Sequence, residues 1–351
     1  MKPSEYFSKS KILPKLSNYP IKEISKRLVK ENILKFGDQS NSYFHLQDDV
    51  RYFYDPSKGI LTFSPVSLPW GKANLVFLKP LCNRNDIIPL IREFEKEHGT
   101  KNIYVGMDET AAKFLEAEGF RVNEIGEEFT IPIQNFKISG RSMRYLRSVK
   151  NYGNRGIVVK EQSWDEVDQD QVYEISKQWM KNKKVKTQEL RLLTAPPNFR
   201  KAWKERKFFC YKDGKLVGFV FFTPVFENGE IIGQCANILR STPFIKPQGI
   251  LDFVVLTAME KFKKEGLRVL ALGLAPLHNI EKRDNDNTIL RYLLGFLYEK
   301  CNFLYSFKPL AFHKSRYKAH TKKVFVCNKE VSTFNSLLFG LKGTGVIKGW
   351  N

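Results

Sequence analysis

Apolar residues in the first third of the chain alternate between strand-like and helix-like spacing. RYFYDPSKGILTFSP (51–65) predicts a β-hairpin whose turn runs from Asp55 to Gly59, and ANLVFLKP (73–80) predicts a third strand. NDIIPLIREFEKEHG (85–99) has apolar residues at helical spacing and ends at Gly99, which predicts a helix. The pattern then predicts a strand at 102–106, a helix at 108–120 capped by Asp108, and separate strands at 121–126 and 127–133.

The second half has a clearer pattern of the same kind. A helix is expected at 165–184, and three apolar runs at 207–212, 215–225 and 230–240 are expected to be strands. The turns Asp213-Gly214 and Asn228-Gly229 separate these runs, so they form an antiparallel meander. The remaining elements are predicted as a helix at 249–266, a strand at 268–276 and a helix at 286–301, followed by the stretch YSFKPLAFHKSRYK (305–318).

This order of elements resembles that of a Gcn5-related N-acyltransferase (GNAT) domain, and the first half resembles a degenerate copy of it. We therefore predict an α/β (α+β) protein with two tandem GNAT-like domains, each a mixed, mostly antiparallel sheet flanked by helices. The predicted organisation is a flexible basic N-terminal lead-in at 1–38, a first domain at 39–136, a basic connecting helix at 137–160, a second, catalytic domain at 161–330 and a C-terminal tail at 331–351.

The connecting segment from Lys137 to Lys160 contains seven Lys or Arg residues and no Asp or Glu. Ser139 can cap a helix in which one stripe is apolar and another is formed by Arg141, Arg144 and Arg147. Guanidinium groups bind phosphate in a bidentate way, so these three arginines are candidates for contacts to tRNA or lipid phosphates. The alternative is a solvated linker helix.

The charge of the whole chain also points to a polyanionic partner. Lys and Arg number 58 against 37 Asp and Glu, which gives a net charge of +21. Nucleic acid and an anionic membrane surface both fit such a charge, and a general solubility role is the alternative. The five cysteines form no CxxC pair, which is typical of a reducing cytosol and gives no metal site. No segment is long and apolar enough for a membrane span, so we expect a cytoplasmic protein or one peripheral on the inner face of the membrane.

The loop after the meander makes acetyl-CoA an unexpected donor. In acyl-CoA users of this fold, this loop presents backbone N–H groups to the pyrophosphate. Here Pro243 and Pro247 remove N–H donors, and Gly249 is the glycine that remains.

Several segments resemble the C-terminal catalytic domain of the phosphatidylglycerol lysyltransferase (multiple peptide resistance factor) family. They are NILRSTPFIKPQGILDFVVLTAMEKFKKEGLRVLALGLAPL and YSFKPLAFHKSRY, with IGEEFTI, the basic connecting segment and EISKQW earlier in the chain. The resemblance covers about residues 40 to 325. It implies a tandem acyltransferase fold that moves an aminoacyl group from a charged tRNA to the glycerol hydroxyl of an anionic phospholipid. It implies no cofactor besides the aminoacyl-tRNA donor.

The family motif DLMR corresponds to NILR (237–240) in this chain, so Arg240 matches its arginine, and Lys314 matches the family's lysine at the aminoacyl group. The resemblance therefore implies that both are catalytic residues. Asn237, Tyr305, Lys308 and Arg316 are candidates for substrate binding. Asn237 stands where the family has Asp and cannot pair ionically with a lysyl ammonium, so alanyl and other donors stay open.

The chain also departs from the family at KTQELRLLTAPPNF (186–199), and it lacks the family's multi-spanning flippase, which leaves a separate membrane flippase as an expected further partner. Transfer to a peptidoglycan precursor or peptide, and a non-catalytic module that binds anionic lipid or RNA, remain as alternatives. We expect His278 and His313 to pack or cap, and Glu127, Glu128 and Asp252 to face water.

Overall fold

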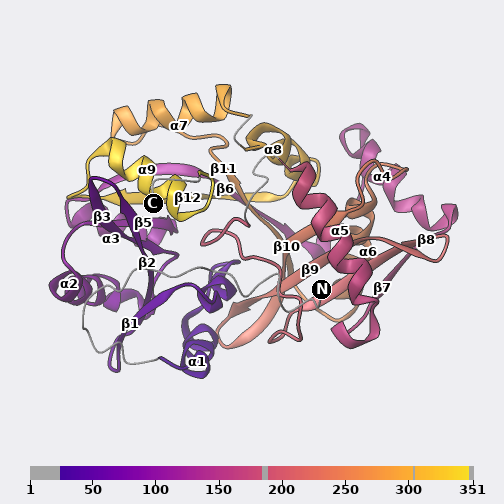
Figure 1. Cartoon of the computed structure of the whole chain (residues 1–351), viewed down its shortest axis with the longest axis horizontal. Helices are drawn as coiled ribbons and strands as arrows, with labels where there is room; N and C mark the ends of the chain where they lie inside the picture. The colour runs from indigo at the N-terminus through magenta and orange to yellow at the C-terminus, as the bar shows by residue number, and fades with distance from the viewer. Residues whose placement is uncertain (1–23, 184–188, 303–304, 348–351) are drawn as a thin grey trace.

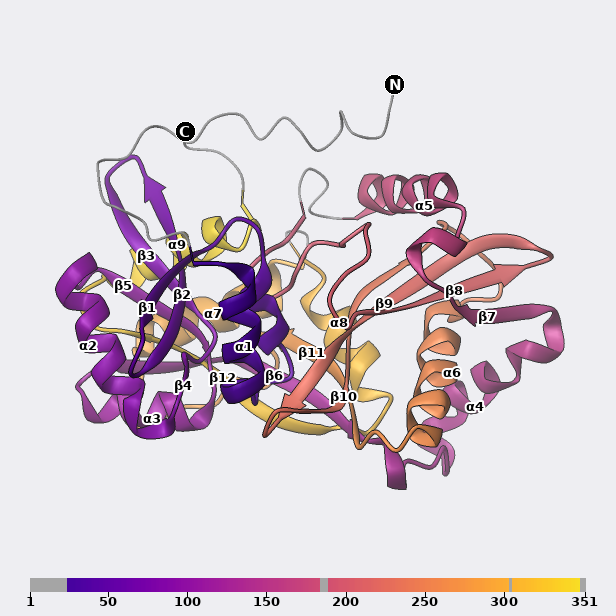
Figure 2. The same cartoon turned by 90° about the horizontal axis from the view of Figure 1, so that it is seen from below.

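The computed structural model describes residues 24–183, 189–302 and 305–347. In these residues the strands form one continuous sheet in the order β1-β2-β3-β5-β12-β6-β11-β10-β9-β8-β7, with the short β4 paired to β2 (Figures 1 and 2). The strands are β1 Arg51–Asp55, β2 Gly59–Leu68, β3 Gly71–Phe77, β4 Leu81–Cys82, β5 Asn102–Met107, β6 Arg121–Pro132, β7 Ile157–Glu161, β8 Arg206–Lys212, β9 Lys215–Glu227, β10 Glu230–Ser241, β11 Val269–Pro276 and β12 His320–Asn328.

Helices lie on both faces of this sheet (Figure 1). They are α1 Lys26–Phe36, α2 Ile87–His98, α3 Glu109–Ala117, α4 Arg144–Lys150, α5 Gln169–Asn182, α6 Ile250–Lys264, α7 Thr288–Lys300, α8 Phe307–Ser315 and α9 Thr333–Gly343. Most strand pairs are antiparallel, and the parallel pairs are β3 with β5 and β10 with β11. The predicted class, a mixed and mostly antiparallel sheet flanked by helices, is therefore confirmed.

The C-terminal part of the chain returns to the first half of the sheet. Strand β12 inserts between β5 and β6, and β6 in turn pairs with β11. Helix α9 then packs on β2, β3 and β5, where Gly343 lies against Leu75 and Val66. The predicted tail at 331–351 contains a helix, Thr333–Gly343, with a packed face. The division into two tandem domains stays a prediction, since one sheet runs through both.

The hairpins, the meander and most of the helices lie where the sequence predicts them. Asp108 caps α3 by accepting a hydrogen bond from the backbone N–H of Ala111, and Gly99 ends α2. The strands predicted at 121–126 and 127–133 are a single strand, β6. Gly126 continues it with φ 130°, a conformation that a side chain rarely adopts, and a Cβ there would lie 2.3 Å from the carbonyl oxygen of Ala275.

Two further expectations are wrong. The lead-in is not flexible over Lys26–Phe36, because α1 buries Val29 and Ile33 completely against the core. The connecting segment is also shorter as a helix than predicted: Arg141–Met143 form a 3-10 turn, α4 follows, and β7 begins at Ile157. Gly140, with φ 74°, precedes the turn in place of a Ser139 cap.

Candidate active site

The candidate site lies where β10 and β11 separate. The two strands pair in parallel only where Gly233–Cys235 of β10 lie beside Val269–Ala271 of β11. Beyond this point β10 continues along β9 and β11 continues along β6, and each strand carries an irregularity in its register at the point of separation. Asn237 is the extra residue of the β10 irregularity. Where the strands separate, backbone N–H and C=O groups on both edges can bind other partners. β-Bulges, which interrupt a ladder in a similar way, are common beside active sites.

Lys314 of α8 binds one of these backbone groups. Its Nζ donates a hydrogen bond of 2.7 Å to the carbonyl oxygen of Leu274 on β11. The side chain is buried, and burial lowers its pKa to about 8, against the opposing effect of Cys235 and Glu128 nearby. Burial also raises the pKa of Glu128, which accepts a hydrogen bond from Ser40. A lysine with a pKa near neutrality can exchange a proton far more readily than an ordinary one.

A cavity of about 300 Å³ lies on the β10 side of this point, and we call it the polar cavity because its wall includes the charged side chains of Lys183, Glu189 and Arg240. Arg240 reaches it almost fully buried, with Nη2 2.6 Å from Oε1 of Glu189, Nη1 donating to Ser176 Oγ, and its guanidinium 4.5 Å from the ring centre of Trp179. The Nε of Arg240 has no hydrogen-bond partner among the described residues. The residues that line the polar cavity are Trp179, Lys183, Glu189, Leu190, Thr194, Ala195, Asn237, Ile238, Leu239, Arg240, Tyr305, Ser306 and Leu310.

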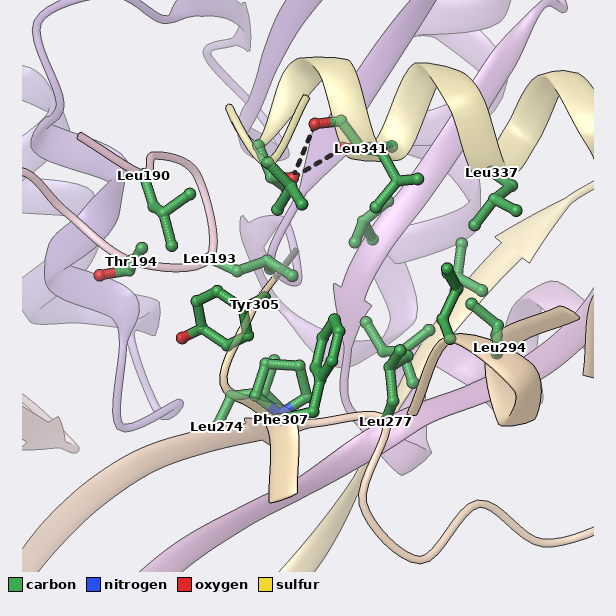
Figure 3. A pocket seen from close by; sticks show the side chains of 18 of the residues that line it. Leu190, Leu193, Thr194, Leu274, Leu277, Leu294, Tyr305, Phe307, Leu337 and Leu341 are labelled. Atoms are coloured by element: carbon green, nitrogen blue, oxygen red, sulfur yellow. Dashed lines mark hydrogen bonds between the residues drawn. The ribbon is translucent and has the colours of Figure 1, made fainter. Parts of the chain in front are cut away.

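An apolar cavity of about 190 Å³ shares part of its lining with the polar cavity. Leucines of α7 and α9 form much of its lining, and Tyr305 and Phe307 lie opposite Leu337 and Leu341 of α9 (Figure 3). Leu274, whose carbonyl oxygen binds Lys314, also lines it. The residues that line both cavities are Leu190, Thr194 and Tyr305.

The structure brings together some of the predicted site residues. Asn237, Arg240 and Tyr305 line the polar cavity, and burial raises the pKa of Tyr305 to about 12. Asn237 donates a hydrogen bond of 3.4 Å to the carbonyl oxygen of Ala195. Lys314 lines neither cavity with its own side chain and reaches this region through Leu274.

The other predicted residues lie elsewhere. Lys308 pairs with Glu299 of α7 at 2.6 Å, although its own segment contains no acidic residue. The guanidinium of Arg316 lies over the rings of Tyr145 and Phe312. None of these residues lines the two cavities, and neither do the phosphate-contact candidates on and just before α4, which are exposed: Arg141, Arg144 and Arg147.

Three acidic residues expected to face water are enclosed in the protein instead. Glu127 and Glu128 lie within strand β6, where Glu127 accepts a hydrogen bond of 2.9 Å from Asn279. Asp252 is buried in the first turn of α6. The sequence did offer one signal for Asp252, since it stands alone among the apolar residues of GILDFVVL.

Asp252 joins three elements around α8. It accepts hydrogen bonds from the hydroxyls of Tyr145 at 2.7 Å and Tyr317 at 2.6 Å, and His313 Nε2 lies 2.8 Å from Oδ1. These contacts lower the pKa of Asp252 against the effect of burial. Because His313 and Tyr317 flank Lys314 in sequence, Asp252 fixes the position of the lysine. His313, which we expected to pack or cap, therefore contacts a buried carboxylate.

Sequence reasoning also missed the partners of Arg240, namely Ser176, Trp179 and Glu189. Glu189 belongs to the segment that departs from the family pattern, so no motif singled it out. In residues 24–183, 189–302 and 305–347, no group of three His, Cys, Asp or Glu side chains is arranged to hold a metal ion. No helix within these ranges has the length and hydropathy needed to cross a bilayer.

Comparison with known proteins places the chain in a family. The model of the family described as phosphatidylglycerol lysyltransferase, C-terminal, matches residues 30–328. The phosphatidylglycerol lysyltransferase of Bacillus subtilis (strain 168) is 22% identical over 312 residues, which are 87% of this chain and 35% of that protein. The chain therefore spans about a third of the length of this curated relative.

Two solved structures share the fold. L-PGS from Bacillus licheniformis superposes with a TM-score of 0.74 at 17% identity, covering 92% of this chain and 97% of the other. The C-terminal domain of a lysylphosphatidylglycerol synthetase homologue from Agrobacterium fabrum gives a TM-score of 0.72 at 17% identity, covering 92% and 99%. Because the family model matches most of the chain, the protein belongs to the family of phosphatidylglycerol lysyltransferase C-terminal domains.

Proposed function

We propose that the protein transfers an aminoacyl group from an aminoacyl-tRNA to a hydroxyl of an anionic phospholipid such as phosphatidylglycerol. One observation carries this proposal: a polar cavity lined by a buried arginine and an apolar cavity lined by leucines share a wall. A lipid substrate has one apolar and one polar part, and it needs two such environments side by side. The family membership supports the same reaction. A hydrophilic peptide acceptor would leave the apolar cavity without a role.

The reaction requires little chemistry from the protein, because the ester of the donor is already activated. The lipid hydroxyl oxygen attacks the ester carbonyl carbon, and a tetrahedral intermediate with a negatively charged oxygen forms. The bond between that carbon and the ribose oxygen then breaks. The hydroxyl proton leaves to a base and is finally taken up by the ribose oxygen. Positioning, a cation near the oxyanion and a proton acceptor are the contributions a protein can make.

Lys314 and Arg240 supply these contributions in our proposal. Arg240 is held by Glu189 and Trp179 and presents a preorganised cation to the polar cavity. Such a group stabilises negative charge without reorganising at the moment of reaction. Lys314, with its pKa lowered to about 8, is the proposed proton acceptor, and it reaches the cavity wall through the carbonyl oxygen of Leu274. Asn237 and Tyr305 contact the donor aminoacyl group from the walls.

The partners follow from this assignment. The donor is a charged tRNA and the acceptor lies in an anionic membrane, so both polyanions match the net charge of +21. The exposed arginines on and just before α4 are the proposed contacts to phosphate. We place the protein on the cytoplasmic side of the membrane, where charged tRNA is present, with a separate flippase as a further partner.

The experiment is transfer in vitro with total charged tRNA and phosphatidylglycerol vesicles. We expect a slower-migrating, ninhydrin-positive lipid, and mass spectrometry then identifies both the amino acid and the acceptor. Lys314→Ala should lose the product, whereas Lys318→Ala, which changes an exposed lysine nearby, should retain it. A wild-type protein that binds vesicles or tRNA in a salt-sensitive manner but makes no aminoacyl product would refute the proposal. So would a product that depends on acetyl-CoA.

A further inference from the structure

Helix α7 is apolar around most of its circumference. Its inner face carries Leu290, Leu294 and Leu297, which line the apolar cavity. Its outer face carries Ile289, Tyr292 and Phe296, whose exposed fractions are 67%, 68% and 58%. A helix that is hydrophobic on all sides is normally buried in a protein core or in lipid. Here only one of the two apolar faces is covered by the described part of the chain.

The three exposed residues form one stripe. They stand at positions i, i+3 and i+7, so they project from the same side of the helix. Figure 1 shows α7 along the outer edge of the molecule, and α7 contacts both α9 and strand β6. Two charged residues of α7 beside this stripe are paired with residues outside the helix. Glu299 pairs with Lys308, and Arg291 pairs with Asp286.

We infer that this outer face of α7 is a docking surface for an anionic phospholipid bilayer. Aromatic and aliphatic side chains of this kind partition into the boundary between headgroups and acyl chains. The choice of a bilayer rests on the proposed function, because the inner face of the same helix walls the cavity that we assign to the lipid. A lipid would then reach the cavity directly from the layer on which α7 lies.

Two further observations favour a bilayer over a protein partner. The nine Lys or Arg residues between residues 300 and 347 include four exposed lysines that can face an anionic surface: Lys300 at the end of α7, Lys318, Lys322 and Lys329. Helix α9, the second wall of the cavity, also carries an exposed aromatic residue at its start, Phe334. Nearby, the indole of Trp70 is half-exposed and donates a hydrogen bond to Asn335.

The test is co-sedimentation with vesicles, which needs no donor and no transfer. We would measure binding to vesicles of phosphatidylcholine alone and of phosphatidylcholine mixed with phosphatidylglycerol. The variant combines Ile289→Ser, Tyr292→Ser and Phe296→Ser, and Phe296→Ser alone is the milder form. We expect the triple variant to lose at least about tenfold in partition to the mixed vesicles, since binding scales with the apolar area that inserts.

A matched control removes exposed apolar side chains at the other end of the sheet. Val158→Ser with Phe244→Ser changes residues that are 48% and 94% exposed, and vesicle binding should stay at the wild-type level. Circular dichroism and thermal unfolding check that every variant is folded. Transfer to a short-chain, monomeric phosphatidylglycerol should be retained by the triple variant, because that substrate does not require docking.

The outcomes separate this inference from the proposed function. Vesicle binding that is equal in the wild type and the triple variant overturns the inference, even if transfer is observed. A wild type that binds no vesicles overturns it as well. A wild type that is a dimer by light scattering, with a monomeric triple variant and unchanged vesicle binding, assigns the face to a second copy of the chain. If the triple variant alone loses vesicle binding and no variant transfers any aminoacyl group, docking is supported while the proposed function fails.

Discussion

The burial of Lys314 has a consequence for stability that can be separated from its role in transfer. Replacing it with Met keeps an apolar stem of similar length and removes the ammonium. Burial lowers the pKa of Lys314 from 10.5 to about 8, so carrying the charge in the folded protein costs (10.5 − 8) × 1.36, or about 3 kcal/mol. The variant also loses the hydrogen bond to Leu274, which lowers its stability by about 1 kcal/mol. Lys314→Met should therefore be about 2 kcal/mol more stable at pH 7 and inactive in transfer.

The pH dependence gives this prediction its direction. In the unfolded chain Lys314 binds a proton below pH 10.5, whereas in the folded chain it does so only below about pH 8. Between these values the unfolded state holds more protons, so the free energy of unfolding of the wild type rises with pH. Lys314→Met has no such group. The advantage of the variant should therefore shrink by about 2 to 3 kcal/mol between pH 7 and pH 10.

The assay is urea denaturation of both proteins at several pH values, with unfolding monitored by tryptophan fluorescence. Other groups that titrate in this range are the same in both proteins, so they cancel in the difference. Lys318→Met is the control, because it removes an exposed charge and should show no such pH-dependent difference. A Lys314→Met protein that is less stable at pH 7, by an amount that does not change with pH, would refute the desolvation of Lys314.

Three further predictions test the cavities and their supports. Gly340 of α9 lines the apolar cavity, and a Cβ there would meet no atom within 4 Å, so Gly340→Ala should gain up to about 1 kcal/mol and keep activity. Gly340→Phe should fill the cavity and raise the KM for long-chain lipid, and equal KM values for the two variants would contradict the assignment. Glu189→Gln leaves the buried Arg240 without an ionic partner and should destabilise the protein by about 2 to 4 kcal/mol in urea, whereas Glu174→Gln on the exposed part of α5 should have little effect. The pKa of Asp252 is lowered, so its contribution to the free energy of unfolding is present above the unfolded value of 3.8 and is lost as the pH falls below it. Asp252→Asn should lower stability at pH 7 and flatten the acid limb of the plot of stability against pH. An acid limb that matches that of the wild type would count against this prediction.

Local sequence predicted local structure well. The Asp-Gly and Asn-Gly turns, the Asp108 cap and the apolar spacing of α2 and α6 act over a few residues, so the printed sequence was sufficient to place them. The expectation of separate strands around Gly126 failed because β11 and β12 on either side hold β6 as one strand. The helices α1 and α9 were not predicted for a similar reason, since they pack against strands that are far away in the chain.

The sequence by itself determined the class of the fold, the basic charge and the resemblance that pointed to Asn237, Arg240, Tyr305 and Lys314. Only the tertiary structure decided which of these groups share a cavity, that Glu189 and Trp179 hold Arg240, and that Asp252 is a buried anchor of α8. Burial and its effect on pKa depend on neighbours that are distant in sequence, and the apolar cavity is formed by α7, α9 and β11 together. No single segment contains the information for such a site, because it exists only where the segments meet.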